Sequence, residues 1–257
     1  MKPLFSFSSV GLADNHELLL QLRQVCKVYK TAAGNFTALD GVTADIHAGE
    51  FVGVIGKSGA GKTTLLNMIT GADTLTSGEV IFNSSEGDST SIHNLSENSM
   101  AVWRGNNVGI IHQSFQLLPM LNLVENIMLP LDFSGHFQRR LSKERAIELL
   151  KLVELEEHAY KLPAYISGGQ KQRVAIARSL ANDPPIIVAD EPTGSLDSLT
   201  AETIFEIFVK LVEQGRTIIM VTHDNNLGPR FSRRLQIADG QVESDSGFRL
   251  PGTLDLQ

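Results

Sequence analysis

The chain has 257 residues, enough to bury a sizeable core in one or two domains. Hydrophobic residues make up 42% of it and charged residues 20%, which excludes a disordered, collagen-like or wholly coiled-coil chain. The formal net charge is −7, which disfavours a nucleic-acid-binding protein because such proteins need clustered cations. The single cysteine, Cys26, excludes an internal disulfide and favours a reducing compartment.

The sequence predicts neither a membrane-spanning helix nor a typical N-terminal signal peptide. No run approaches the roughly 18 consecutive apolar residues of a membrane-spanning helix. The first residues have one lysine and a short apolar run broken by serines, which resembles a signal peptide only faintly. We therefore predict a loosely ordered extension at 1–17, one folded domain at 18–245 and a C-terminal tail at 246–257.

From residue 18 onward, short β-branched runs alternate with longer segments of helical period, which favours an α/β protein with a central sheet. The predicted strands cover residues 18–29, 42–46, 51–55, 79–82, 108–112, 186–190, 217–222 and 235–238. The predicted helices cover residues 62–69, 122–131, 142–156, 169–180, 199–213 and 226–231. An uninterrupted helical pattern predicts an inserted helical subdomain at about 115–170, and the Ser- and Asn-rich residues 83–99 predict a surface excursion.

A phosphate-binding loop stands between a predicted strand and a predicted helix. Residues 56–63 read GKSGAGKT and satisfy the pattern G-x-x-x-x-G-K-[ST] directly after the buried strand 51–55. Glycines let backbone N–H groups close around an anion, and the helix start adds positive partial charge. We expect Lys62 to reach the β- and γ-phosphates and the Thr63 hydroxyl to bind Mg²⁺. The candidate nucleotide-binding residues here are Gly56, Lys57, Ser58, Gly59, Ala60, Gly61, Lys62, Thr63 and Thr64.

Polar residues also follow three further predicted strands. Asp190 and Glu191 end an apolar run, where the first acid suits Mg²⁺ and the second can polarise a water that attacks the γ-phosphate. His223 and Gln113 each follow another strand, and the amide can bind both a metal-bound water and the nucleophile. Function in such folds gathers at the carboxyl ends of strands. The candidate catalytic residues are therefore Lys62, Gln113, Glu191 and His223, and the candidate metal ligands are Thr63, Gln113 and Asp190.

A second turn that contains glycines, Ser167-Gly168-Gly169-Gln170, stands at the start of a predicted helix. The chain therefore has two helix starts that could bind an anion but only one phosphate loop. This turn resembles the signature motif of the ATP-binding cassette (ABC) ATPases, and further motifs match that family in order over roughly residues 18–245. The ordered set is Tyr29, the phosphate loop, Gln113, the signature, Asp190-Glu191, Ser195-Leu196-Asp197 and His223. Ile166 stands where the family most often has leucine, which keeps an apolar anchor.

The resemblance implies a P-loop NTPase core with a mixed central sheet, an N-terminal antiparallel β region and the helical insert. It implies ATP and Mg²⁺ as cofactors, with Glu191 as general base, His223 as its γ-phosphate-contacting companion and Tyr29 stacking on adenine. It also implies a head-to-tail dimer that sandwiches two ATP molecules, a homodimer being favoured over a heterodimer. The residues that resemble its cross-subunit contacts are Ser167, Gly168, Gly169, Gln170 and Asp197.

The residues after Gln113 resemble the bacterial subgroup that serves macrolide exporters and lipoprotein-releasing complexes. Apolar residues there, among them Leu118 and Met120, either dock a transmembrane permease or pack the helical subdomain. We predict an ATP-hydrolysing subunit that powers export or membrane extrusion through a separate permease, from the cytoplasmic face of the membrane and with membrane contact through that partner. An ATPase that controls an extracytoplasmic enzyme or sensor is the alternative.

Two groups of basic residues are predicted to form solvated faces, with contact to anionic lipid or to the partner as the alternative. The first group is Arg139, Arg140, Lys143 and Arg145, and the second is Arg230, Arg233 and Arg234. A cassette ATPase that works on nucleic acid is disfavoured, because the chain has no room for a long coiled coil, zinc modules or tandem cassettes.

Overall fold

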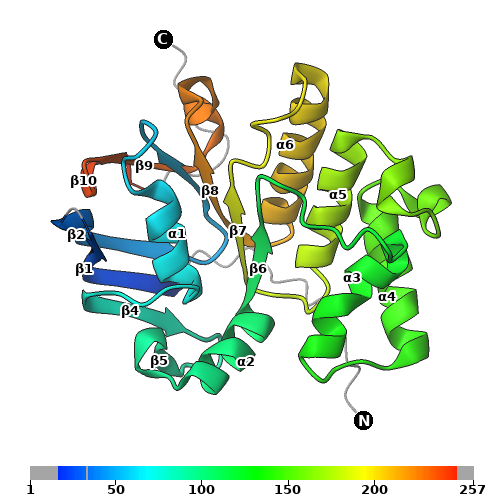
Figure 1. Ribbon diagram of the computed structural model, residues 1–257, viewed down its shortest axis with the longest axis horizontal. Coiled ribbons are helices and arrows are strands. Elements are labelled where there is room, and N and C mark those ends of the chain that lie inside the picture. The colour runs from blue at the N-terminus through cyan, green and yellow to red at the C-terminus, as the bar shows by residue number, and fades with distance from the viewer. Residues whose placement is uncertain (1–16, 33, 248–257) are drawn as a thin grey trace. The chain divides into compact units, whose positions relative to one another are not determined.

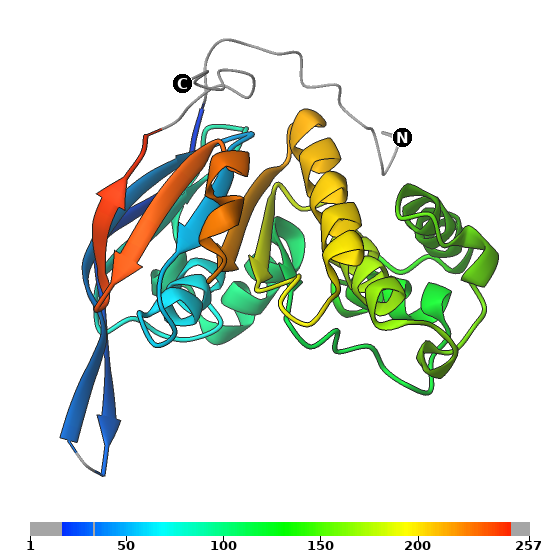
Figure 2. The same cartoon turned by 90° about the horizontal axis from the view of Figure 1, so that it is seen from above.

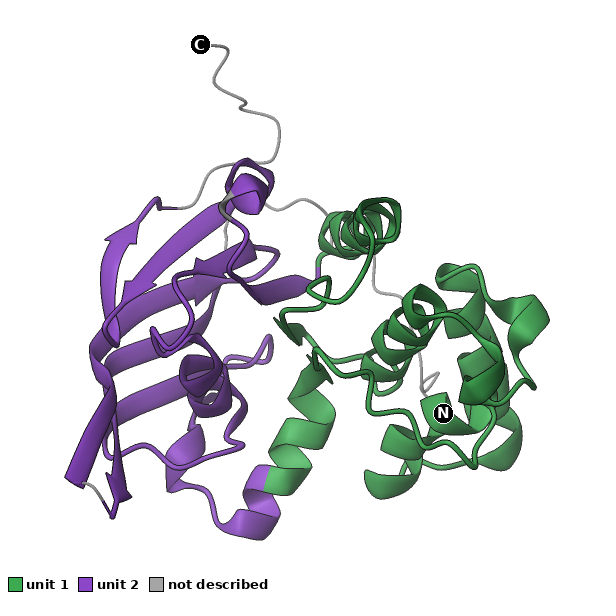
Figure 3. Cartoon of the chain, turned by 45° about the horizontal axis from the view of Figure 1, so that its top comes forward, with its two compact units in different colours: residues 1–12, 101–215 green, residues 13–100, 216–257 purple. Residues whose placement is uncertain are grey.

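The computed structural model describes residues 17–32 and 34–247, which fall into two compact units (Figure 3). Unit 1 holds residues 101–215, and unit 2 holds the other described residues. The predicted N-terminal extension and C-terminal tail lie almost wholly outside the described ranges, so both stay predictions. None of the helices in the described ranges is both long enough and apolar enough to span a bilayer.

Unit 2 contains an antiparallel sheet whose longest strands form one hairpin. The strand order is β2 (Gly34–His47), β1 (Leu18–Thr31), β4 (Ser77–Asn83) and β5 (Ser89–Ser91). Leu20 pairs with Ile46 on one side and with Phe82 on the other, and all three side chains are buried. Beyond the sheet, β1 and β2 continue as a two-stranded arm (Figure 2). The expected N-terminal antiparallel region is therefore present.

A second group of strands in unit 2 is mixed in direction and carries the phosphate loop. The strands are β10 (Gln241–Asp245), β9 (Arg233–Ala238), β3 (Phe51–Ile55) and β8 (Thr217–Thr222). β3 runs parallel to both β8 and β9, whereas β10 pairs antiparallel with β9. β3 and β8 are buried along their whole length, which is why both read as continuous apolar runs. α1 (Lys62–Thr70) follows β3 and packs against β2 and β8 (Figure 1).

Gly53 in the middle of β3 is covered by an aromatic ring. A Cβ atom at Gly53 would lie 2.2 Å from Cδ2 of Phe231. That ring packs edge-on against Phe51, with ring centroids 5.0 Å apart and planes at 88°. A larger residue at position 53 would therefore have to displace a packed aromatic pair.

We expect Gly53→Ala to lower the free energy of unfolding by about 1–3 kcal/mol, because overpacking forces side chains off their preferred rotamers. Denaturant titration, followed by the midpoint and its slope, measures this loss. Gly105→Ala is the matched control, since no atom lies within 4 Å of a Cβ placed at Gly105 and alanine favours a helix interior. Equal stability of the two variants would contradict the packing role of Gly53.

Unit 1 combines one parallel strand pair with helices. β6 (Val108–Ile111) pairs in parallel with β7 (Ile186–Asp190). The helices are α3 (Leu123–Phe133), α4 (Arg139–Leu152), α5 (Gly168–Ser179) and α6 (Ser198–Glu213), and α2 (Glu97–Asn107) leads into β6. α3 packs against both α4 and α5. Between α4 and α5 the described residues form two short 3₁₀ turns, η2 (Glu156–His158) and η3 (Pro163–Tyr165), and no strand. The expected helical insert is therefore present.

Several element boundaries differ from those that the sequence predicts. The segment 83–99 is more than a surface excursion, because it contains β5, a 3₁₀ turn η1 (Ile92–Asn94) and the start of α2. α2 is missed because most of its residues are polar, and only Met100 and Trp103 are buried. α4 ends at Leu152, short of the predicted Glu156, because Glu154 adopts a left-handed conformation with φ of 57°.

Three further differences concern strand length and helix type. β2 begins at Gly34, well before the predicted Val42, because its exposed hairpin end carries little apolar pattern. β10 is missed because four of its five residues are exposed. The predicted helix at 226–231 is a 3₁₀ segment, η4 (Asn225–Arg230), which contains Pro229; proline lacks the N–H that a longer α-helix needs.

Two members of the predicted basic faces are buried. The Arg233 guanidinium binds Asp245 through Nε and Nη2, at 2.9 and 2.6 Å, and Glu50 through Nη1 at 3.3 Å. Arg145 binds Asp183 at 3.3 Å. These two arginines are therefore structural, because paired carboxylates offset the cost of burying the charge. Arg139, Arg140, Lys143 and Arg234 are exposed, as the sequence predicts.

Candidate active site

The phosphate loop in unit 2 is built around the Lys62 side chain. Its Nζ donates hydrogen bonds to the carbonyls of Gly56 and Lys57, at 2.7 and 2.9 Å, and the side chain is only 6% exposed. Gly61 precedes α1 with φ of 103°, and a Cβ there would lie 2.4 Å from the Ala38 carbonyl oxygen. No side chain caps the start of α1. The first N–H groups of the helix and the Lys62 ammonium therefore both lie at the loop. This cradle suits a polyphosphate.

Two other predicted residues also lie in unit 2. Tyr29, near the end of β1, donates a hydrogen bond from its hydroxyl to Oδ2 of Asp73 at 2.9 Å. Burial raises the pKa of Tyr29, and the bond to Asp73 raises it further. His223 directly follows β8 and its side chain is exposed. Unit 2 therefore supplies the aromatic, the phosphate loop and the histidine of the predicted set.

Unit 1 brings Gln113 and Glu191 close together. A Cβ atom at Gly194 would lie 3.4 Å from both Nε2 of Gln113 and Oε2 of Glu191. The two residues follow the parallel neighbours β6 and β7, whose carboxyl ends meet at one edge. Glu191 has φ of 45°, a left-handed conformation that is costly for a residue other than glycine and often marks a functional position. An amide and a carboxylate thus share one small region at a strand end.

The signature turn starts α5 with a reciprocal cap. The Ser167 hydroxyl accepts from the Gln170 N–H at 3.2 Å, and the Ser167 N–H donates to Oε1 of Gln170 at 2.9 Å. A Cβ at Gly169 would lie 2.2 Å from Cγ2 of Thr200. The serine and glutamine therefore fix the helix start, and the glycine lets Thr200 approach it.

Asp197 caps α6 and is held by the same threonine. Thr200 donates its hydroxyl to Oδ2 of Asp197 at 2.7 Å and its N–H to Oδ1 at 3.0 Å. These two hydrogen bonds lower the pKa of Asp197, which remains exposed. Thr200 thus links the aspartate loop to the signature turn. Sequence reasoning missed it, although the spacing D-x-x-T is a recognisable helix-cap signal.

Arg178 near the end of α5 is a second residue that sequence reasoning missed. Its guanidinium donates to the carbonyl oxygens of Phe115 and Gln116, at 3.0 and 2.6 Å. This fork holds the segment that follows Gln113, where Gln116 adopts a left-handed conformation with φ of 49°. No sequence signal could have found this contact, because the acceptors are backbone atoms more than sixty residues away.

The predicted residues do not all lie in one unit, so their joint arrangement stays a prediction. Gln113, the signature, Asp190, Glu191 and Asp197 belong to unit 1, whereas the remaining members belong to unit 2. Within the described ranges, no group of three or more His, Cys, Asp or Glu residues could hold a metal ion. A Mg²⁺ site made of Thr63, Gln113 and Asp190 therefore rests on the expected contribution of phosphate oxygens.

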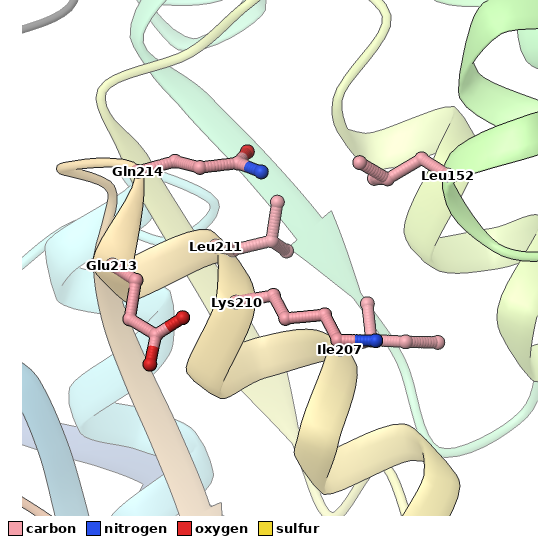
Figure 4. Close-up of a pocket in the computed structure, with 6 residues that line it drawn as sticks. All are labelled: Leu152, Ile207, Lys210, Leu211, Glu213 and Gln214. Atoms are coloured by element: carbon pink, nitrogen blue, oxygen red, sulfur yellow. The ribbon is translucent and has the colours of Figure 1, made fainter.

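A cavity of about 160 Å³ lies elsewhere in unit 1 (Figure 4). Figure 4 shows Leu152 of α4 opposite Lys210, Leu211 and Gln214 at the end of α6. Ile207 and Glu213 complete its lining. None of the predicted site residues lines this cavity, so it does not replace the phosphate loop as the nucleotide site.

The comparisons with known proteins point to one family. The sequence profile described as ABC transporter matches residues 39–194. The ABC transporter ATP-binding protein MJ0796 of Methanocaldococcus jannaschii is 43% identical over 235 residues, which cover 90% of this chain and 98% of that protein. The macrolide export ATP-binding/permease protein MacB of Syntrophobacter fumaroxidans is 40% identical over 89% of this chain, but only 32% of that protein is covered.

A solved structure agrees with both sequence matches. The dimeric, post-hydrolysis structure of MJ0796 bound to ADP and Pi superposes with a TM-score of 0.79 and 41% identity, over 88% of this chain and 97% of that one. The antiparallel sheet, the mixed strands beside the phosphate loop and the helical insert are all those of the ABC ATPase fold. This chain therefore belongs to the ABC transporter family and is one of its ATP-binding ATPases.

Proposed function

We propose that this ATPase powers export, or extrusion from the membrane, of a substrate that passes through a separate transmembrane permease. The proposed direction of transport rests on the 40% identity to MacB, whose name describes an ATP-binding/permease protein for macrolide export. This chain matches about a third of MacB, which supports a permease contributed by another polypeptide or segment. The chain would then act at the cytoplasmic face of the membrane, with its membrane contact through that partner.

The proposed hydrolytic roles follow from the chemistry of the two units. Lys62 and the N–H groups at the start of α1 hold the β- and γ-phosphates, and Tyr29 contacts the base. Glu191 accepts a proton from the attacking water, with Gln113 beside it and His223 at the γ-phosphate. Thr63, Asp190 and Gln113 would hold Mg²⁺, which neutralises charge on the phosphate oxygens when it is bound.

The proposed active assembly is a dimer that closes on two ATP molecules. The relative MJ0796 is dimeric in its post-hydrolysis structure with ADP and Pi, which supports a dimeric assembly here. Ser167 and Gly168 are exposed at the start of α5, whereas Gly169 and Gln170 are half-buried. This helix start can receive the γ-phosphate of the second subunit. Asp197 is exposed and its lowered pKa keeps it ionised, which suits a contact across the subunit interface. A homodimer is the simplest form of this assembly.

The proposed permease contact lies in the segment that follows Gln113. Leu118 and Met120 are 41% and 70% exposed, which favours docking over a role in packing the helical insert. The fully buried Asn126 fixes the position of this segment, because its amide forms four hydrogen bonds with the backbone of Leu118, Leu121 and Asn122. Arg178 holds the same segment at its other end. The exposed side chains of Leu118 and Met120 therefore lie on a loop near Gln113 that hydrogen bonds hold in one conformation.

We expect Leu118→Asp and Met120→Asp to lower permease-stimulated ATP turnover at least about threefold, because an unpaired charge in a desolvated contact costs more than the roughly 1–3 kcal/mol of an unpaired neutral polar group. Basal turnover of the isolated chain should stay within about twofold of the wild-type rate, since neither residue belongs to the proposed hydrolytic set. Phe133→Asp is the control, because Phe133 is an 83% exposed apolar residue at the end of α3. Equal loss of basal and stimulated turnover would instead assign Leu118 and Met120 to packing.

Reconstitution tests the proposed function itself. The chain is purified with the membrane protein that accompanies it, inserted in vesicles, and assayed for substrate movement against ATP turnover. ATP-dependent movement of substrate out of the cytoplasmic compartment or the membrane supports export. ATP-dependent change in an extracytoplasmic enzyme or sensor activity without movement of substrate would support the alternative, and movement inward would contradict the export direction.

A further inference from the structure

A buried lysine lies against the ring of Tyr29. Lys27 and Tyr29 are two residues apart on β1 and therefore share one face of the strand. The Lys27 ammonium is 4.8 Å from the centroid of the Tyr29 ring, and its side chain is only 9% exposed. It donates hydrogen bonds to Oδ1 of Asp73 at 2.8 Å and to the Thr74 carbonyl. The cation is therefore fixed over one face of the ring.

The same carboxylate holds the Tyr29 hydroxyl. Oδ1 of Asp73 binds Lys27, and Oδ2 accepts from the Tyr29 hydroxyl at 2.9 Å. Although partial burial opposes it, the bonds from Lys27 and Tyr29 hold the pKa of Asp73 below its usual value. The Asp73 carboxylate thus stays ionised and fixes both the Lys27 ammonium and the Tyr29 hydroxyl.

The contact with Asp73 attaches the ring to the phosphate-loop helix. Asp73 follows the end of α1, and its N–H donates to the Asn67 carbonyl at 3.4 Å. The ring of Tyr29 is therefore fixed relative to α1, the helix that the phosphate loop precedes.

We propose that Lys27 is a positioning residue for the nucleotide base: through Asp73 it fixes the Tyr29 ring so that a purine stacks on the face opposite the ammonium. The inference rests on the proposed contact between Tyr29 and the base. Because the ammonium occupies one face, only the other can receive a base. The tether to Asp73 fixes the ring relative to α1, which begins at the phosphate loop.

The test compares a ligand that has a base with one that has none. Dissociation constants for ATP and for inorganic tripolyphosphate are measured by titration calorimetry on wild type, Lys27→Met, Lys27→Arg and Lys30→Met. We expect Lys27→Met to weaken ATP binding about 5- to 10-fold, the loss that a partly buried cation–π contact and a hydrogen bond predict. Tripolyphosphate binding should stay within about twofold, and Lys27→Arg, which keeps a cation beside the ring, should retain most of the ATP affinity.

Lys30→Met is the matched control, because Lys30 lies three residues along the same strand and is exposed. It should leave both affinities unchanged. Equal weakening of ATP and tripolyphosphate by Lys27→Met would overturn the proposal and assign Lys27 to folding alone. Unchanged ATP affinity in Lys27→Met would overturn it as well.

Tyr29→Phe provides a second variant, which keeps the ring and removes only the hydroxyl that binds Asp73. We expect it to weaken ATP binding about 3- to 10-fold, since one hydrogen bond to a charged group is lost, again with tripolyphosphate unaffected. Wild-type ATP affinity in Tyr29→Phe would exclude the tether. The wild-type titrations separate this inference from the function on which it rests: a chain that binds tripolyphosphate and ATP with equal affinity has no base contact at all.

Discussion

Replacing Glu191 with glutamine will lower ATP turnover by about a hundredfold or more while ATP binding is retained, because general-base catalysis contributes about 10²- to 10⁴-fold. Glutamine has the same shape as glutamate but cannot accept a proton at neutral pH. Glu191 lies close to the Gln113 amide and occupies a left-handed backbone position at the end of β7. Single-turnover and steady-state phosphate release measure the loss, and equilibrium titration with ATP measures binding.

Glu206→Gln is the control for this variant, because Glu206 is an exposed glutamate on α6. Its turnover should equal that of the wild type. A Glu191→Gln protein that hydrolyses ATP at the wild-type rate would exclude Glu191 as the base. Loss of ATP affinity together with turnover would instead place Glu191 in nucleotide binding.

Replacing Lys62 with methionine will weaken ATP binding by about 10- to 100-fold, the cost of one hydrogen-bonded charge contact, and turnover will fall with it. The Lys62 ammonium is enclosed by the phosphate loop and is already turned toward the carbonyls of Gly56 and Lys57. A bound polyphosphate would offer this ammonium an anionic partner in the same small space. Fluorescent-nucleotide titration and thermal melting separate affinity from stability.

Lys57→Met offers a close comparison within the same loop, since Lys57 contributes its backbone to the loop and is exposed whereas Lys62 is buried. It should bind ATP within about threefold of the wild type, as expected for an exposed charge in high dielectric. If the two lysine variants bind ATP equally well, Lys62 does not contact the phosphates. A lower melting temperature for Lys62→Met alone would reflect the two loop carbonyls that lose their donor.

The sequence predicts best those elements whose residues are buried on both faces. The bounds of β3, β7 and β8 agree with the predicted ranges 51–55, 186–190 and 217–222, because long apolar runs between polar residues leave little freedom in the boundary. The phosphate loop was predictable because its spacing is specific and its context is a strand followed by a helix. α2 and β10 were not predictable, since each buries few residues and carries a weak apolar pattern.

Contacts between distant residues lie beyond what sequence spacing can show. The burial of Arg233 depends on Glu50 and Asp245, so its charge alone wrongly suggested a solvated face. Likewise, nothing near Gly169 in the sequence points to Thr200, and nothing near Gln116 points to Arg178. Lys27 and Tyr29 are neighbours on one strand, but their common partner Asp73 lies more than forty residues away. Each of these contacts is set by how the elements pack.

ATP-driven dimerisation is the central claim about this ATPase, and the mass of Glu191→Gln in solution tests it most directly. Light scattering after gel filtration is carried out with Mg²⁺ and ATP, with Mg²⁺ and ADP, and without nucleotide. We expect a dimer with two bound ATP molecules in the first condition and a monomer in the other two, because each subunit's signature turn would receive the γ-phosphate held by its partner. A monomer that is saturated with ATP would contradict the proposed composite site.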